Sequence, residues 1–183
     1  KLSNQKVEDL ISGARIDQNA QKENSLDFTL WKSTNEGIKW QSPWGLGRPG
    51  WHTECVVMID SIFNEMIDIH GGGGDLKFPH HENEIAQSIA HSNHKLANYW
   101  MHNGFVNIND EKMSKSLGNF KLTKDLLETY DGNILRLAML STHYRQPINF
   151  SDELLDSQMK VYEKIERAYK QVGIYLQVNE IAS

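Results

Sequence analysis

Apolar residues recur every three to four positions along much of the chain, and this spacing predicts amphipathic helices. The longest follows residue 150, with Ser151 as its candidate N-cap. Thr123 and Asp131 are candidate N-caps of two shorter helices, and Pro79 suits the first turn of another. The expected helices cover residues 7–14, 51–65, 79–91, 123–130, 131–142 and 151–176.

Short apolar or alternating segments predict strands at residues 26–31, 66–69 and 105–108. Glycine and proline are dense in residues 34–50, which predicts an irregular loop with Trp40 and Trp44 as its packing anchors. A second, polar loop is expected at residues 110–119. Strands and helices alternate in the middle of the chain, so we expect an α/β layer followed by an all-helical last third.

Composition narrows the classes of protein that remain. The chain has 183 residues and a net charge of -5, so one domain or slightly more is expected, without a domain-wide basic surface for nucleic acid. No stretch approaches the apolar length of a membrane helix. Cys55 is the single cysteine, which excludes an intrachain disulfide and favours the reducing cytoplasm. The chain begins with Lys1 instead of methionine, and we expect it to be a piece of a larger protein.

Cys55, His80 and Glu84 form a candidate metal site. His80 and Glu84 are four residues apart on one expected helix, so their side chains point the same way. Cys55 offers a thiolate from a different element, and a sulfur, nitrogen and oxygen set suits zinc better than magnesium or calcium. Each residue also has an ordinary explanation, because a lone cysteine is commonly a small core residue and this His–Glu spacing is common on helix surfaces. A tetrahedral site needs a fourth ligand, and the chain holds no second cysteine.

Four glycines at residues 71–74, followed by Asp75, come after a short expected strand. A strand that ends in a glycine-rich turn before a helix is a common nucleotide site in α/β proteins, and Asp75 offers a carboxylate to ribose hydroxyls. The segment matches neither of the common phosphate-binding glycine motifs. A flexible turn with Asp75 as a local cap is the competing interpretation.

The letters KMSKS at residues 112–116 place Lys112 and Lys115 in a polar loop after a strand. Two ammonium groups beside hydroxyls are suited to bind a polyphosphate, although a solvated basic loop is the simpler interpretation. Trp51 lies four residues before Cys55 and offers an apolar wall beside a metal. We expect the remaining histidines of interest to be structural or exposed; they are His52, His70, His81 and His91.

Taken together and in this order, these segments resemble cysteinyl-tRNA synthetase, a class I aminoacyl-tRNA synthetase family. The resemblance rests on GRPGWHTEC at 47–55, DIHGGGGDLKFPHHENEIAQS at 68–88 and YWMHNGFVNINDEKMSKSLGN at 99–119. It extends from about residue 26 to about residue 150. The family's HIGH signature is absent, so the chain resembles a fragment that lacks the HIGH-containing N-terminal half and the anticodon-binding end.

The resemblance implies a role for each candidate residue. Cys55, His80 and Glu84 would be three of the family's zinc ligands, and Trp51 would flank the pocket for the amino-acid side chain. The segment from Gly73 through His80 is similar to the class I G-x-D-x-x-x-x-H segment, with Gly73 and Asp75 at ATP and Asp75 on its ribose. The remaining implied roles concern ATP: the backbone near Val106 would face adenine, and Lys115, with Lys112, would contact phosphate.

The fold class implied is α/β, the second half of a Rossmann-like synthetase catalytic domain followed by a helical-bundle segment. The implied division is 1–47 for part of an inserted connective segment, 48–108 for the half-domain, 109–150 for the KMSKS subdomain and 151–183 for the start of the bundle. The implied activity is cysteine–tRNA ligase. It uses Zn²⁺, and its substrates are L-cysteine, tRNA(Cys) and ATP with Mg²⁺. We expect a cytoplasmic monomer with no membrane partner.

Two alternatives remain open. A cysteine ligase of the mycothiol pathway shares this catalytic core and joins cysteine to an amino sugar. A zinc-binding or nucleotide-binding module without catalysis is the other, because the HIGH half is missing. We expect the piece alone to be inactive and to bind zinc weakly.

Overall fold

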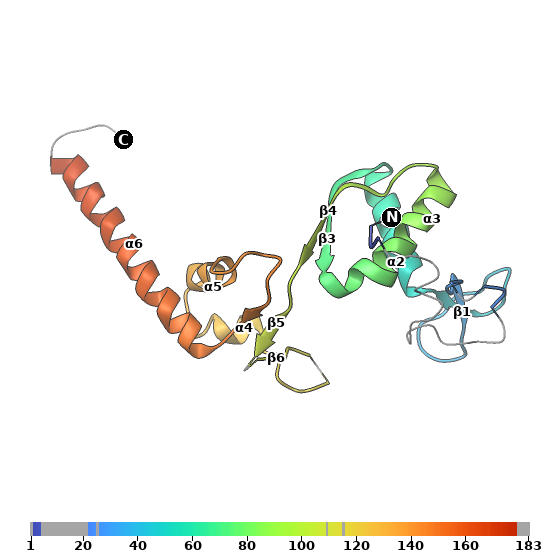
Figure 1. The fold of residues 1–183 in the computed structure, drawn as a ribbon, viewed down its shortest axis with the longest axis horizontal. Helices are drawn as coiled ribbons and strands as arrows, with labels where there is room; N and C mark the ends of the chain where they lie inside the picture. The colour runs from blue at the N-terminus through green and yellow to red at the C-terminus, as the bar shows by residue number, and fades with distance from the viewer. Residues whose placement is uncertain (1, 5–21, 25, 109, 115, 179–183) are drawn as a thin grey trace. The chain divides into compact units, whose positions relative to one another are not determined.

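A computed structural model describes residues 2–4, 22–24, 26–108, 110–114 and 116–178. The chain divides into two compact units, Lys1–His102 and Asn103–Ser183 (Figure 1). The helix expected at residues 7–14 lies outside the described residues. Among the described residues, no helix combines the length and the apolar composition needed to cross a bilayer.

Two helices and two strands build the part of the first unit that holds the candidate metal site. Strands β3 (Ile67–Gly73) and β4 (Ala97–Asn103) are hydrogen-bonded neighbours. Helices α2 (Trp51–Phe63) and α3 (Glu82–Ser92) pack against each other. The prediction of a helix at 51–65 and a strand at 66–69 is therefore confirmed, although β3 continues through three of the four glycines that were expected to form a turn.

A small antiparallel pair precedes α2. Strand β1 (Trp31–Ser33) pairs with β2 (Gly47–Pro49), so the expected strand at 26–31 is wrong except at its last residue. The loop expected at 34–50 contains β2 and a bridge from Trp40 to Gly47. Trp40 and Trp44 are 54% and 74% exposed, so they do not anchor the loop in a core as predicted. Backbone hydrogen bonds between β1 and β2 hold this segment in place of packing by the two tryptophans.

The connection from β3 to α3 differs from the expected helix that starts at Pro79. A 3-10 turn, Gly74–Leu76, leads into a π-helical turn, Lys77–His81, and the α-helix begins only at Glu82. Phe78 interrupts this turn with extended backbone angles, φ -140 and ψ 135. Because a residue before proline is sterically driven out of the helical region, the regular helix cannot run continuously through this point.

The second unit contains a three-stranded sheet in the order β6-β5-β7. Strand β5 (Val106–Ile108) pairs antiparallel with β6 (Glu111–Lys112) and parallel with β7 (Ile148–Asn149). The strand expected at 105–108 is confirmed, whereas β6 replaces part of the expected loop and β7 makes the all-helical last third wrong. Strands β6 and β7 have two residues each, which is too short for any alternation of polar and apolar positions to show.

Helices α5 (Gly132–Leu140) and α6 (Asp152–Val178) pack together beside this sheet. Two predicted caps are confirmed: the Asp131 carboxylate accepts the N–H of Asn133 at 2.7 Å, and Ser151 Oγ accepts the N–H of Leu154 at 3.2 Å. The core of the unit consists of Ile108, Ile134, Leu135, Ala138, Phe150 and Leu155.

The helix expected at 123–130 is shorter in the structure. Helix α4 covers only Thr123–Leu126, and Leu122 is its N-cap in place of Thr123. The Leu122 side chain offers no acceptor to the first-turn N–H groups, so one usual determinant of a longer helix is missing.

Candidate metal centre and nucleotide-binding segments

Three side chains from separate positions in the first unit converge at one point. Cys55 lies on α2, His80 lies in the π-helical turn, and Glu84 lies in the first turn of α3. Cys55 Sγ is 3.5 Å from His80 Nε2, which is 3.0 Å from Glu84 Oε1. One potential ligand atom from each residue lies within 4.8 Å of the others. The spacing of four residues therefore brings His80 and Glu84 together although the two residues do not share one regular helix.

Glu84 is the unusual member of this group, because its side chain is fully buried and both carboxylate oxygens lack a hydrogen-bond donor. His80 Nε2 and His70 Nε2 lie 3.0 Å from Oε1 and 3.1 Å from Oε2, but neither contact has the alignment of a hydrogen bond. Burial opposes ionisation, yet the contact with His70 and the neighbouring imidazoles hold the pKa of Glu84 below its usual value. A buried carboxylate without well-aligned hydrogen bonds is costly, and a bound cation would compensate its charge.

The spacing of the three atoms fits a zinc ion. Zinc bonds of about 2.3 Å to sulfur and about 2.0–2.1 Å to nitrogen and oxygen imply tetrahedral edges of about 3.6 Å for S···N and about 3.3 Å for N···O. The observed separations of 3.5 Å and 3.0 Å are close to these edges. The residues present therefore fit zinc in donor chemistry and in spacing.

Cys55 is a protonated thiol in the metal-free arrangement at neutral pH. Burial, followed by the negative charge of Glu84, raises the pKa of the Cys55 thiol to about 11. A cation beside the sulfur would reverse this effect, since a metal ligand must be the thiolate.

A second group of possible ligands shares Glu84. It consists of His70, His81 and Glu84, and His81 Nδ1 lies 2.8 Å from His102 Nε2. Burial lowers the pKa of His81 to about 4, so this ring is neutral at physiological pH. The two groups together offer only two negative ligands, the Cys55 thiolate and the Glu84 carboxylate, so their charge balances one divalent cation and not two.

Several histidines of this cluster were not expected to take part in a site. His70 and His81 contact the Glu84 group as described, and His52 Nδ1 lies 2.7 Å from His80 Nδ1. His102, on β4, was not among the residues predicted to lie at a site. A usable signal was present in the sequence, because each of these histidines stands near the end of an expected strand or helix, where side chains from different elements meet.

Trp51 lies directly beside the candidate ligands. Its indole stacks on His80 with ring centroids 4.3 Å apart and an interplanar angle of 29°. The side chain remains 56% exposed, so it offers an apolar surface next to the metal group.

Asp75 and Gly73 lie close together at the end of β3. A Cβ atom at Gly73 would come within 2.6 Å of Asp75 Oδ1, so the carboxylate occupies the space that a side chain there would need. Asp75 is an exposed residue of the 3-10 turn.

The described part of the KMSKS loop lies in the second unit. Lys112 ends β6, and its Nζ lies 4.0 Å from the centroid of the Phe105 ring. The carbonyl of Val106 accepts the N–H of Met113 at 2.9 Å, so the start of the loop is tied to β5. Lys115 lies outside the described residues.

Serine and asparagine side chains close the same loop on itself. The N–H of Ser114 donates to Asn119 Oδ1 at 2.9 Å, and the hydroxyls of Ser114 and Ser116 are 3.1 Å apart. These polar contacts join Ser114 to Ser116 and to Asn119.

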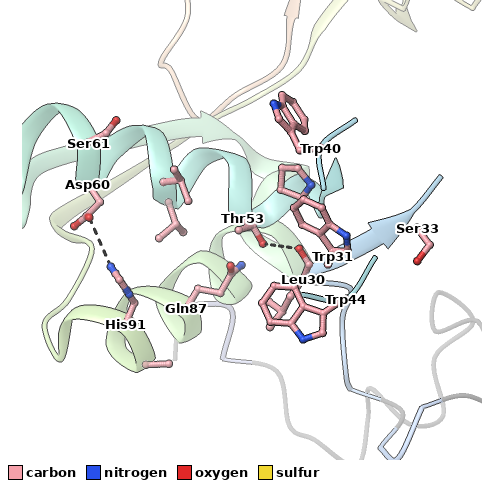
Figure 2. A pocket seen from close by; sticks show the side chains of 14 residues that line it. Leu30, Trp31, Ser33, Trp40, Trp44, Thr53, Asp60, Ser61, Gln87 and His91 are labelled. Carbon is pink, nitrogen blue, oxygen red and sulfur yellow. Dashed lines mark hydrogen bonds and ion pairs between the residues drawn. The ribbon is translucent and has the colours of Figure 1, made fainter. Parts of the chain in front are cut away.

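A large apolar cavity of about 1230 Å³ lies between α2, α3 and the β1–β2 pair. Figure 2 shows tryptophan side chains along one side of it and the ion pair between His91 and Asp60, 3.7 Å apart, on the other. Cys55, His80 and Glu84 do not line this cavity. It is therefore separate from the candidate metal centre.

Comparison with models of known protein families shows which family the chain belongs to. The sequence profile described as the tRNA synthetases class I (C) catalytic domain matches residues 1–160. The chain belongs to this family. The α/β class expected from the sequence, part of a Rossmann-like class I catalytic domain with a following helical segment, is thereby confirmed.

Members of the class I (C) family with assigned names are close in sequence. The chain is 57% identical over 180 residues to the cysteine–tRNA ligase of Acholeplasma laidlawii (strain PG-8A). This alignment covers 98% of the chain and 42% of that protein. The chain is also 57% identical over 173 residues to the cysteine–tRNA ligase of Staphylococcus carnosus (strain TM300). This second alignment covers 94% of the chain and 37% of that protein. The chain thus spans about two fifths of the length of these curated relatives.

A more distant solved structure has the same fold. The LeuRS of Agrobacterium radiobacter K84, in a ternary complex with tRNA and LeuAMS, aligns with a TM-score of 0.55 at 16% sequence identity. The alignment covers 73% of the chain and 21% of that protein.

Proposed function

We propose that this chain supplies the thiol-selective metal site and part of the ATP site of an enzyme that activates L-cysteine and transfers it to tRNA(Cys). The observation that carries the proposal is the buried Glu84 carboxylate, which has no well-aligned hydrogen bond and lies beside His80 Nε2 and Cys55 Sγ. Membership of the class I (C) family and the similarity to cysteine–tRNA ligases support the same function.

Selectivity for cysteine is the problem that such a site solves. Cysteine and serine differ by one atom, and contacts in an apolar pocket discriminate small groups by only about 1–3 kcal/mol. A zinc ion held by Cys55, His80 and Glu84 would supply a borderline-soft Lewis acid that prefers the soft thiolate to a hydroxyl. The exposed indole of Trp51 would border the side chain of the bound amino acid.

Activation requires the cysteine carboxylate to attack the α-phosphorus of ATP in line, with pyrophosphate as the leaving group. Positioning and charge stabilisation carry this reaction, with little need for acid–base chemistry. We assign Asp75 to the ribose hydroxyls, with Gly73 allowing close approach, and the backbone near Val106 to adenine. Lys112 and Lys115 would stabilise the charge on the phosphates of ATP, which enters with Mg²⁺.

Cysteine-dependent exchange of pyrophosphate into ATP tests the activation step in the complete protein. We expect exchange with L-cysteine and far less with L-serine. Cys55→Ser should lower zinc content or reduce the preference for cysteine over serine. Met58→Ser, at a 54% exposed position of the same helix, is the matched control and should change neither.

Two outcomes would contradict the proposal. Unchanged zinc content and unchanged discrimination in Cys55→Ser would reject the ligand role. Transfer of activated cysteine to an amino sugar and not to tRNA(Cys) would reject the acceptor while leaving the activation step intact.

A further inference from the structure

The ring of His80 is held by contacts on its edge and on its face. His52 Nδ1 lies 2.7 Å from His80 Nδ1, and Trp51 stacks on the ring at 4.3 Å. His80 is 4% exposed, so no bulk water competes for its nitrogens. Its second nitrogen, Nε2, is the atom that faces Cys55 and Glu84.

Two imidazole nitrogens 2.7 Å apart must share one proton, and the direction of that hydrogen bond sets the tautomer of both rings. If His80 donates from Nδ1, its Nε2 carries a lone pair and can bind a metal. If His52 donates instead, neutral His80 carries its proton on Nε2 and cannot bind one. Metal ligation by His80 therefore requires His52 to be the acceptor.

We propose that His52 is a positioning residue for the metal site: it accepts the Nδ1 proton of His80 and so keeps His80 Nε2 available as a ligand. The inference rests on the proposed zinc site. Metal-binding histidines commonly donate their second N–H to a carboxylate or a carbonyl, and here an imidazole takes that place.

The surroundings of His52 hold its ring for this role. His52 is three residues before Cys55 on α2, so one helix face presents both a candidate ligand and the partner of another. Trp51 stacks near the His52 ring at 5.5 Å, and Phe28 meets it edge-on at 5.6 Å. The half-buried ring therefore has aromatic neighbours that restrict its orientation.

Two variants distinguish the effect of the His52 hydrogen bond from the effect of its ring packing. His52→Phe keeps a planar ring for the aromatic contacts but removes the acceptor. His52→Asn loses the ring but can place its amide oxygen where Nδ1 stood. His91→Phe, which changes an exposed histidine away from the cluster, is the matched control.

Zinc affinity of the complete protein is measured by competition with a chelator, and histidine tautomers are read from ¹⁵N shifts of labelled imidazoles. We expect His52→Phe to weaken zinc binding by about 10- to 100-fold, His52→Asn to recover most of it, and His91→Phe to change nothing. In the zinc-bound wild type, His80 should carry its proton on Nδ1 and His52 on Nε2.

The outcomes are distinguishable. A wild-type protein that binds no zinc would overturn the proposed metal site and this inference with it. Normal zinc binding by the wild type and by His52→Phe would overturn the role of His52 alone. Equal losses in His52→Phe and His52→Asn, or a proton on His80 Nε2 in the zinc-bound state, would also overturn it.

Discussion

Gly72 in β3 is required by the side chain that lies against it. A Cβ atom at this position would come within 2.8 Å of His81 Cε1 and 3.1 Å of Leu76 Cδ1. His81 is 1% exposed and is held through its contact with His102 at 2.8 Å, so the ring has no free space into which to turn. Gly72→Ala therefore forces either the strand or the histidine cluster to move.

The size of the effect follows from this overlap. The Cβ–Cε1 distance is about 0.6 Å short of the 3.4 Å at which ordinary contact begins. Forcing an extra carbon into a packed site costs about 1–3 kcal/mol. Gly71→Ala is the matched control, because its nearest neighbour would be Met101 O at 3.7 Å. There the reduced entropy of the unfolded chain should make alanine neutral or stabilising by up to about 1 kcal/mol.

Thermal unfolding of both variants in excess chelator measures packing without any contribution from metal. For a unit of about 100 residues, each kcal/mol shifts Tm by about 4–8 °C. We expect Gly72→Ala to unfold at least about 4 °C below the wild type and Gly71→Ala at or above it. Equal Tm values for the two variants would refute the claim that His81 occupies the space beside Gly72.

Other consequences can be measured separately. Leu155 is fully buried in the core of the second unit, so Leu155→Ala should lower the free energy of unfolding by about 2–5 kcal/mol. A decrease of under about 1 kcal/mol in a urea titration would contradict its place in the core. Asp131→Ala removes the N-cap of α5 and should lower the free energy of unfolding by about 1 kcal/mol, whereas Asp131→Asn keeps an acceptor and should lower it much less. An equal decrease of the denaturant midpoint in both variants would argue against the cap. Glu84→Gln keeps the side-chain size but loses the charge, and should weaken zinc binding at least about tenfold; unchanged chelator competition would exclude Glu84 as a ligand.

The proximity of the three candidate ligands followed from the sequence even where the local structure did not. His80 and Glu84 were expected on one helix that starts at Pro79, but a π-helical turn precedes α3. A separation of four residues brings side chains together in either geometry, so the error in the helix start did not affect the pairing. Cys55 could be added only through its chemistry, since its position depends on how α2 packs against α3.

The contacts that surround the candidate ligands could not be predicted from the sequence patterns. The pairing of His52 with His80 and of His81 with His102 depends on which sides of packed elements face each other, and hydrophobic spacing does not record this. The exposure of Trp40 was likewise missed, because an apolar side chain that bridges to the edge of a small strand pair need not reach a core. The nucleotide assignments, including Asp75, depend on the resemblance to the family and stay predictions.

X-ray absorption at the zinc edge of the zinc-loaded chain tests the metal centre most directly. Because Cys55 is the single cysteine of the chain, we predict one sulfur at about 2.3 Å with nitrogen or oxygen at about 2.0–2.1 Å, and loss of the sulfur in Cys55→Ser. L-cysteine, but not L-serine, should add a second sulfur. A zinc ion without a sulfur neighbour in the wild-type chain, or identical spectra with the two amino acids, would contradict the account.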